Sequence, residues 1–222
     1  GSVKTYAVNH ILFAPEASAF TITANPFAHL MFSGVGVINN SNVTQTFMTK
    51  VQEGDFGVGA VVFENEASAG SLSSFINSAS PSSSIVGGLI DFFNNANAGH
   101  ATFTNEGGSV QFAWGGEIEF FDATSAGSAT FINHGATNLG TLGGMISFEG
   151  VSSAAEGIFF NYGAESPALG AEMFFSQGAD AGNATITNNG GTVEGASGGT
   201  IYFYDTTSCS TATVINNGGT VP

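Results

Sequence analysis

Four carboxylates are the residues of this chain whose types and spacing could do chemistry: Asp91, Glu117, Glu119 and Glu149. Asp91 and Glu119 are 28 residues apart, and the other two flank them in the sequence. Like charges held close together disfavour joint ionisation, so three interpretations stand. The cluster is solvated surface, or a calcium site, since calcium takes about six to eight oxygens. Alternatively, Asp91, Glu117 and Glu119 belong to a polysaccharide hydrolase, whose two carboxylates lie about 5 to 9.5 Å apart.

Other residue types offer less chemistry. The chain has no arginine, the base on which many polysaccharide-eliminating β-helix enzymes depend. Its single cysteine, Cys209, rules out an internal disulfide and occupies a position that is alanine elsewhere, so we expect a buried, inert filler. The four histidines are not spaced as a set of metal ligands: His10, His29, His100 and His134.

A repeat of about 28 residues must position these side chains. Six segments, "GAVVF", "GGLIDF", "GGEIEF", "GGMISF", "GAEMFF" and "GGTIYF", each end in a phenylalanine. The phenylalanines are Phe63, Phe92, Phe120, Phe148, Phe175 and Phe203. A column of asparagines keeps the same period: Asn77, Asn105, Asn133, Asn161, Asn188 and Asn216. Two columns with one period are typical of a solenoid.

The fold class that follows is all-β, a right-handed parallel β-helix with coils of about 28 residues. Both repeated blocks alternate apolar and polar residues, which predicts strands. Equivalent residues of successive coils would stack about 4.8 Å apart, and parallel crossovers are usually right-handed. A third, weaker strand is expected after the Gly-Gly pair, in "SVQFAW" and "TVEG".

We expect one continuous domain in two parts. Residues 1–58 predict irregular first coils or a cap, with Phe13 and Phe32 in place of the phenylalanine column, because terminal repeats are commonly atypical. Residues 59–222 predict regular coils. The sequence stops within a repeat at Pro222, and an uncapped coil exposes strand edges, so we expect the natural protein to continue.

Charge and hydropathy exclude some partners. The formal net charge is −15, with only two lysines and no arginine. Nucleic acids and anionic membranes are bound through Lys and Arg, so neither is an expected partner. No run of 18 apolar residues predicts insertion into a membrane.

Two polar columns admit a structural and a functional interpretation. The asparagines favour a structural ladder in a corner of the coil over a row of ligands. The outward side of the second strand carries threonines, interrupted by Ile132, Ile158 and Ile215 and started by Ser74. Threonine is a good strand residue, but regular Thr arrays also resemble ice-binding faces. The threonines are Thr102, Thr104, Thr130, Thr185, Thr187 and Thr213.

Outward aromatic residues predict an interaction surface, because exposed apolar strips mark interfaces. Phe93 and Phe121 follow the interior phenylalanine and should lie side by side, while Phe174, Tyr202 and Tyr204 form a second group. The partner would be a loop, another copy of the chain, or a sugar.

Units such as "SAGSATFINHG", "DAGNATITNNGG" and "NAGHATFTNEGG" resemble repeats of bacterial surface proteins, namely the β-helical regions of autotransporter-like adhesins and related secreted proteins. The resemblance covers about residues 59–221 and implies an exported, extracellular or cell-surface rod. Such a rod is a non-enzymatic structural or adhesive scaffold without a cofactor, calcium apart. Its partners would be other copies, neighbouring segments of the parent chain, glycans or a host or cell surface. A carbohydrate-active enzyme and an ice-binding protein are the alternatives.

Overall fold

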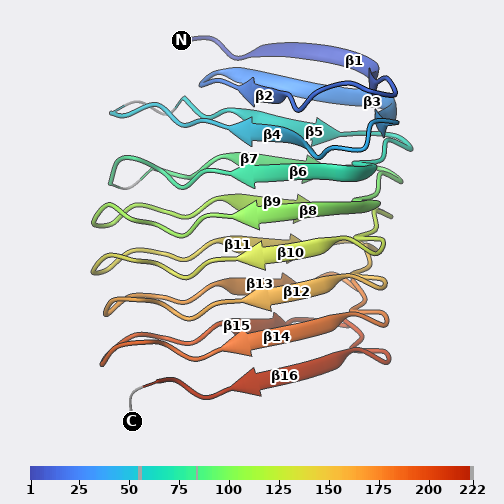
Figure 1. Cartoon of the computed structure of the whole chain (residues 1–222). Helices are drawn as coiled ribbons and strands as arrows, with labels where there is room; N and C mark the ends of the chain where they lie inside the picture. Colours follow the sequence, from blue (N-terminus) through green and yellow to red (C-terminus); the bar gives the residue numbers. More distant parts are fainter. Residues whose placement is uncertain (55–56, 84, 221–222) are drawn as a thin grey trace.

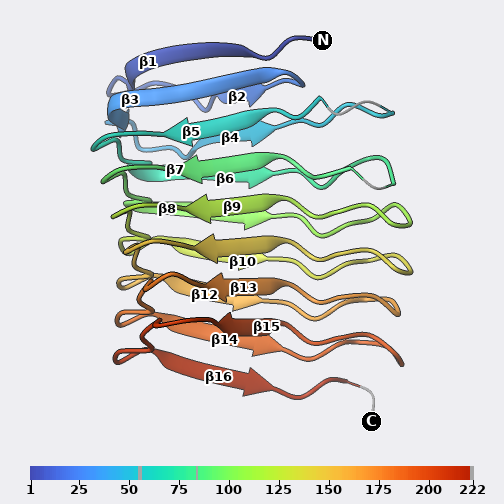
Figure 2. The same ribbon diagram turned by 180° about the vertical axis from the view of Figure 1, so that it is seen from behind.

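The computed structural model describes residues 1–54, 57–83 and 85–220, which form sixteen β-strands and no helix. Odd-numbered strands make one eight-stranded sheet and even-numbered strands make a second, and every pair of neighbouring strands is parallel. In Figures 1 and 2 the two sheets lie back to back, and the chain moves down one coil with each turn. The sense of the turn is right-handed. The predicted parallel β-helix with coils of about 28 residues is confirmed.

The strands of the regular coils are short, because each coil turns a corner at both ends. The odd-strand sheet consists of β1 (Lys4–Phe13), β3 (Ala28–Asn39), β5 (Ala60–Phe63), β7 (Leu89–Phe92), β9 (Glu117–Phe120), β11 (Met145–Phe148), β13 (Glu172–Phe175) and β15 (Thr200–Phe203). The even-strand sheet consists of β2 (Thr21–Ala24), β4 (Gln45–Thr49), β6 (Ser71–Asn77), β8 (His100–Asn105), β10 (Thr130–Asn133), β12 (Ile158–Asn161), β14 (Thr185–Asn189) and β16 (Thr213–Asn217).

Stacked phenylalanine rings fill the space between the sheets. Rings of one sheet stack on those of the next coil with centroids 4.5–5.0 Å apart, as in Phe92 and Phe120. Rings of opposite sheets meet edge to face, as in Phe120 and Phe131 at 5.9 Å. Both geometries are favourable for aromatic pairs. Buried alanines such as Ala129 leave room for the rings, so large and small columns interdigitate along the rod.

The asparagine column forms a hydrogen-bonded ladder inside the corner after the even strands. Each side-chain Nδ2 donates to Oδ1 of the next asparagine at 2.9–3.2 Å, from Asn77 through Asn216. Asn77 Nδ2 also donates to the carbonyl oxygen of Glu117 at 2.8 Å, which ties the corner to the following odd strand. The ladder thus satisfies polar groups that burial would otherwise leave unpaired.

Glycine pairs narrow each coil beyond this corner and open into a protruding arm of turns. A Cβ on Gly115 would lie 2.3 Å from the Gly143 oxygen, and one on Gly135 would lie 2.4 Å from the Gly163 oxygen. Only glycine therefore permits the close approach of successive coils. The predicted third strand is wrong: residues 109–114 and 192–195 are turns and bends. Ala113 N donates locally to Val110 O at 2.8 Å, which closes a turn instead of extending a strand.

The first coils belong to the same two sheets but have longer strands. Phe32 pairs in register with Phe63 and joins the phenylalanine column, as expected. Phe13 does not join it: a register shift follows Val8, and Val8 is the partner of Phe32. Phe13 lies further along β1 and packs edge-on against Phe47 at 6.2 Å. It therefore enters the same core from a different position.

The last described coil corrects a second expectation. Cys209 is exposed, not a buried filler. Its neighbour Ser208 continues a one-residue parallel ladder through Asp180 and Ser153, so its place in the coil matches the alanine column. Burial of that column requires a coil on each side, and none follows Cys209 among the described residues. Val221 and Pro222 lie outside the described residues.

Candidate binding surfaces

The outer side of the odd-strand sheet, here called the mixed face, holds the predicted carboxylates. It has two rows, and their residue types change from coil to coil. One row is Thr5, His29, Ala60, Leu89, Glu117, Met145, Glu172 and Thr200. The second row is Ala7, Met31, Val62, Asp91, Glu119, Ser147, Phe174 and Tyr202. Asp91 and Glu119 are therefore neighbours on adjacent coils, with Glu117 beside them.

Burial and mutual repulsion perturb these carboxylates. Burial, with repulsion from Glu119 and Glu117, raises the pKa of Asp91 to about 7. Burial also raises the pKa of Glu119 to about 7, helped by repulsion from Glu117 and Glu149. Asp91 Oδ1 is buried and has no hydrogen-bond partner among the described residues. Near neutral pH the pair therefore holds protons that ordinary surface carboxylates would have lost.

The geometry around these acids gives little support to a metal or a substrate. In the described parts of the chain, no three His, Cys, Asp or Glu side chains are grouped so that they could hold a metal ion. The surface hollows described below are lined by other residues, and none includes Asp91, Glu117 or Glu119. A flat ladder of acids lacks the enclosed site in which substrates are usually bound.

The outward aromatic residues form two stacked ladders. Phe93 and Phe121 stack with centroids 4.9 Å apart at an interplanar angle of 5°. Phe174 stacks on Tyr202 at 4.9 Å, and Tyr202 on Tyr204 at 6.0 Å. Ring faces that cover one another are not free for a sugar. These ladders consequently favour the packing of coil on coil over glycan stacking.

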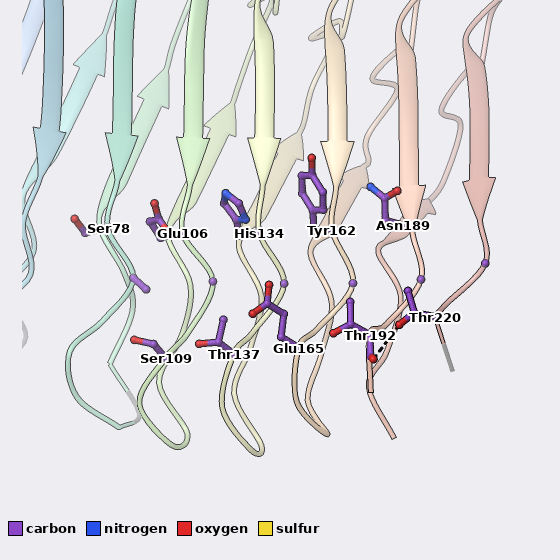
Figure 3. A pocket seen from close by; sticks show the side chains of 16 residues that line it. Ser78, Glu106, Ser109, His134, Thr137, Tyr162, Glu165, Asn189, Thr192 and Thr220 are labelled. Atoms are coloured by element: carbon purple, nitrogen blue, oxygen red, sulfur yellow. Dashed lines mark hydrogen bonds between the residues drawn. The ribbon is translucent and has the colours of Figure 1, made fainter. Parts of the chain in front are cut away.

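A groove runs along the rod between the even-strand sheet and the arm, with a volume of about 750 Å³. Figure 3 shows two rows of side chains on its walls. The row beyond the even strands is Ser78, Glu106, His134, Tyr162 and Asn189. The row on the arm is Ser109, Thr137, Glu165, Thr192 and Thr220. The glycines of the neck lie between the rows and leave the floor bare: Gly107, Gly135, Gly163, Gly190 and Gly218.

Several polar heads in this groove are available to a ligand. The side chains of Glu106, His134, Tyr162 and Glu165 form no hydrogen bond with the described residues, and His134 stacks on Tyr162 at 5.4 Å. The other histidines lie elsewhere: His10 and His29 on β1 and β3, His100 at the start of β8. We missed the groove in the sequence, although the position after each ladder asparagine is polar or aromatic in successive coils.

The outer side of the even-strand sheet, here called the threonine face, also has two rows. The first row is Thr21, Thr46, Ser74, Thr102, Thr130, Ile158, Thr185 and Thr213. The second row is Thr23, Met48, Ile76, Thr104, Ile132, Phe160, Thr187 and Ile215. The array thus begins at Thr21, two coils before the Ser74 start inferred from sequence. The alternation in "FTITAN" and "TQTFMT" is the signal that could have revealed those coils.

The fold and these surfaces define a class: a right-handed β-solenoid repeat protein whose polar side chains run in rows along the axis. Comparisons with protein-family models, with curated proteins and with solved structures find no match to this chain. No helix long and apolar enough to cross a membrane occurs within the described ranges.

Proposed function

We propose that this chain is a non-enzymatic structural and adhesive scaffold of an exported bacterial surface or extracellular repeat protein, and that its groove holds a glycan. The observation that carries the proposal is the groove itself, with unpaired polar heads on successive coils. Short polar side chains on a rigid backbone suit a ligand that carries hydroxyls at regular intervals. The groove is long and open, as an extended polymer chain requires.

Backbone and charge narrow the class of ligand. The hydrogen bonds of both sheets run between coils, so the groove offers no free strand edge to which a peptide could add. Glu106 and Glu165 line the groove, and the chain carries a net charge of −15. Polyanions are therefore repelled, and a neutral or cationic glycan is favoured.

The test is binding of labelled neutral glucans, mannans and partly deacetylated chitin oligosaccharides, with alginate as the polyanion. We expect binding in the neutral or cationic group, weakened about tenfold by Tyr162→Ala, or about 1.4 kcal/mol. Tyr204→Ala, on the mixed face, is the matched control and should bind normally. The groove is not the site if Tyr204→Ala loses binding while Tyr162→Ala keeps it, and the proposal fails if no glycan binds.

A polysaccharide hydrolase is the second candidate, and one observation favours it. A carboxylic acid with a pKa of about 7, such as Asp91 or Glu119, can serve as a general acid near neutral pH. Release of reducing ends from the same glycans, abolished by Asp91→Asn, would establish hydrolysis in place of the scaffold. We expect no release.

Calcium binding by Asp91, Glu117, Glu119 and Glu149 stays a prediction. Thermal unfolding at pH 8 with millimolar calcium, and again with a chelator, tests it. A ligand at a hundred times its dissociation constant stabilises the folded state by about 2.7 kcal/mol. We expect a much smaller change, since the described residues offer no converging ligand group; a large calcium-dependent rise in Tm would assign the site.

A further inference from the structure

The threonine face differs from its counterpart on the same rod. Its two rows hold nine threonines in sixteen positions, whereas the two rows of the mixed face hold two, Thr5 and Thr200. Both faces are the outer sides of parallel sheets built on one core. If threonine were used only as a good strand residue, both faces would contain it equally. The concentration on one face therefore requires an explanation outside the fold.

The positions of the threonines form a two-dimensional array. Residues of each row are in-register partners on successive coils, from Thr46 through Ser74 to Thr213, with no register shift inside the rows. Neighbouring coils repeat at about 4.8 Å, and the two rows are two residues apart along the strand, or about 6.6 Å. In Figure 1 the arrows of β6 to β14 point in nearly the same direction, so the array persists along the rod.

The hydroxyls of this array are not used by the fold. None of the nine threonine hydroxyls bonds to a protein atom among the described residues. Threonines elsewhere are bonded: Thr49 Oγ1 donates to Asn77 Oδ1 at 2.8 Å, and Thr124 Oγ1 to Phe121 O at 2.6 Å. Each free hydroxyl can donate one hydrogen bond and accept two. The natural partner of such a surface is water.

The second row supplies apolar groups beside the hydroxyls. Met48, Ile132 and Phe160 are half-buried members of it, and neither row contains a charged side chain. Charged residues begin only at the borders, as with Glu106 on the groove side and Glu156 on the other. Ionic groups would impose hydration shells of their own, whereas methyl groups and hydroxyls can share one ordered layer.

We propose that the threonine face binds ice, by holding water in a layer that is continuous with the crystal surface. A lattice is the ligand that matches a period kept over eight coils. A second copy is a weaker fit, because two such faces pressed together would bury hydroxyls without partners, which costs free energy. The inference does not depend on the groove or on glycan binding.

The experiment measures thermal hysteresis and inhibition of ice recrystallisation by the whole chain. We expect the protein to shape ice crystals and to slow their growth. Thr130→Lys puts a long charged side chain in the centre of the array and should raise the concentration needed by about tenfold. Val151→Lys, at an exposed turn away from the array, is the matched control and should act like the unaltered protein.

Two further variants separate the contributions. Thr130→Val keeps the methyl group and removes the hydroxyl, and Thr130→Ser does the reverse; each should lose part of the activity while the melting curve shows an intact fold. The proposal is overturned if the unaltered protein leaves ice growth unchanged, or if Thr130→Lys is as active as Val151→Lys. Sedimentation that shows a dimer abolished by Thr130→Lys would assign the face to a second copy instead.

Discussion

The mixed face and the threonine face rest on one core but follow different rules. On the mixed face a row passes through Val62, Asp91, Glu119, Ser147 and Phe174 within five coils. On the threonine face the equivalent row holds six threonines and one serine in eight coils. The inward columns are equally regular in both sheets. The core therefore explains the regularity inside the rod, and selection for a surface property explains it on the threonine face.

The largest expected effect comes from a change that weakens both faces alike. Asn133→Ala removes the acceptor of Asn105 Nδ2 and the donor to Asn161 Oδ1 in a buried ladder. Unpaired buried groups of this kind cost about 3 kcal/mol together. Denaturant unfolding measures the loss, with the exposed Asn95→Ala as the control. Equal stability of the two variants would show that the ladder does not support the coils.

The next effect belongs to the mixed face alone and depends on pH. The folded-state pKa of Asp91, about 7, lies above its ordinary value, so the folded chain binds a proton that the unfolded chain releases. Stability therefore falls as pH rises from about 4 to about 7 and stays low above it.

Asp91→Asn removes that penalty. It should stabilise the chain by about 2 kcal/mol at pH 8 and change little at pH 4. Glu119→Gln should act in the same direction, because the same burial and repulsion raise its pKa. Unfolding curves at both pH values measure this. Destabilisation by Asp91→Asn at pH 8 would mean that the ionised carboxylate makes favourable contacts.

A smaller effect is expected from the aromatic ladder at the edge of the mixed face. Phe121→Ala removes the ring that stacks on Phe93, and a double-mutant cycle of the two positions should give a coupling of about 1 kcal/mol. Denaturant unfolding of the four proteins measures it. A coupling near zero would leave these rings free for a ligand and revive glycan stacking on this face.

Periodic columns made the coil predictable from sequence, because every coil repeats the same contacts with its neighbours. Phe63 and Asn77 each recur at one spacing, and stacking along the axis forces that regularity. The same logic failed where a contact is not repeated. Phe13 enters the core after a register shift in β1, and Cys209 lacks a second neighbouring coil among the described residues.

Surfaces were harder to predict, since they depend on which segments the coil brings together. The groove joins Tyr162 beyond β12 to Glu165 on the arm, and the arm itself was expected to be a strand. Thr21 and Thr46 escaped notice because the first coils have altered spacing, and only strand pairing sets their register. Sequence therefore identified the unit of the fold, while the surfaces required the assembled coils.

The smallest effect on stability is expected at Thr130, and it sharpens the comparison most. Thr130→Val should change the free energy of unfolding by less than about 0.5 kcal/mol, because its hydroxyl bonds to no described residue and valine also favours strands. Denaturant unfolding at pH 4 and pH 8 should give the same small value, since no carboxylate lies in its row. A loss above about 1 kcal/mol would show that the threonines serve the fold. A neutral change that still weakens the action on ice would show that the row is kept for the surface it presents.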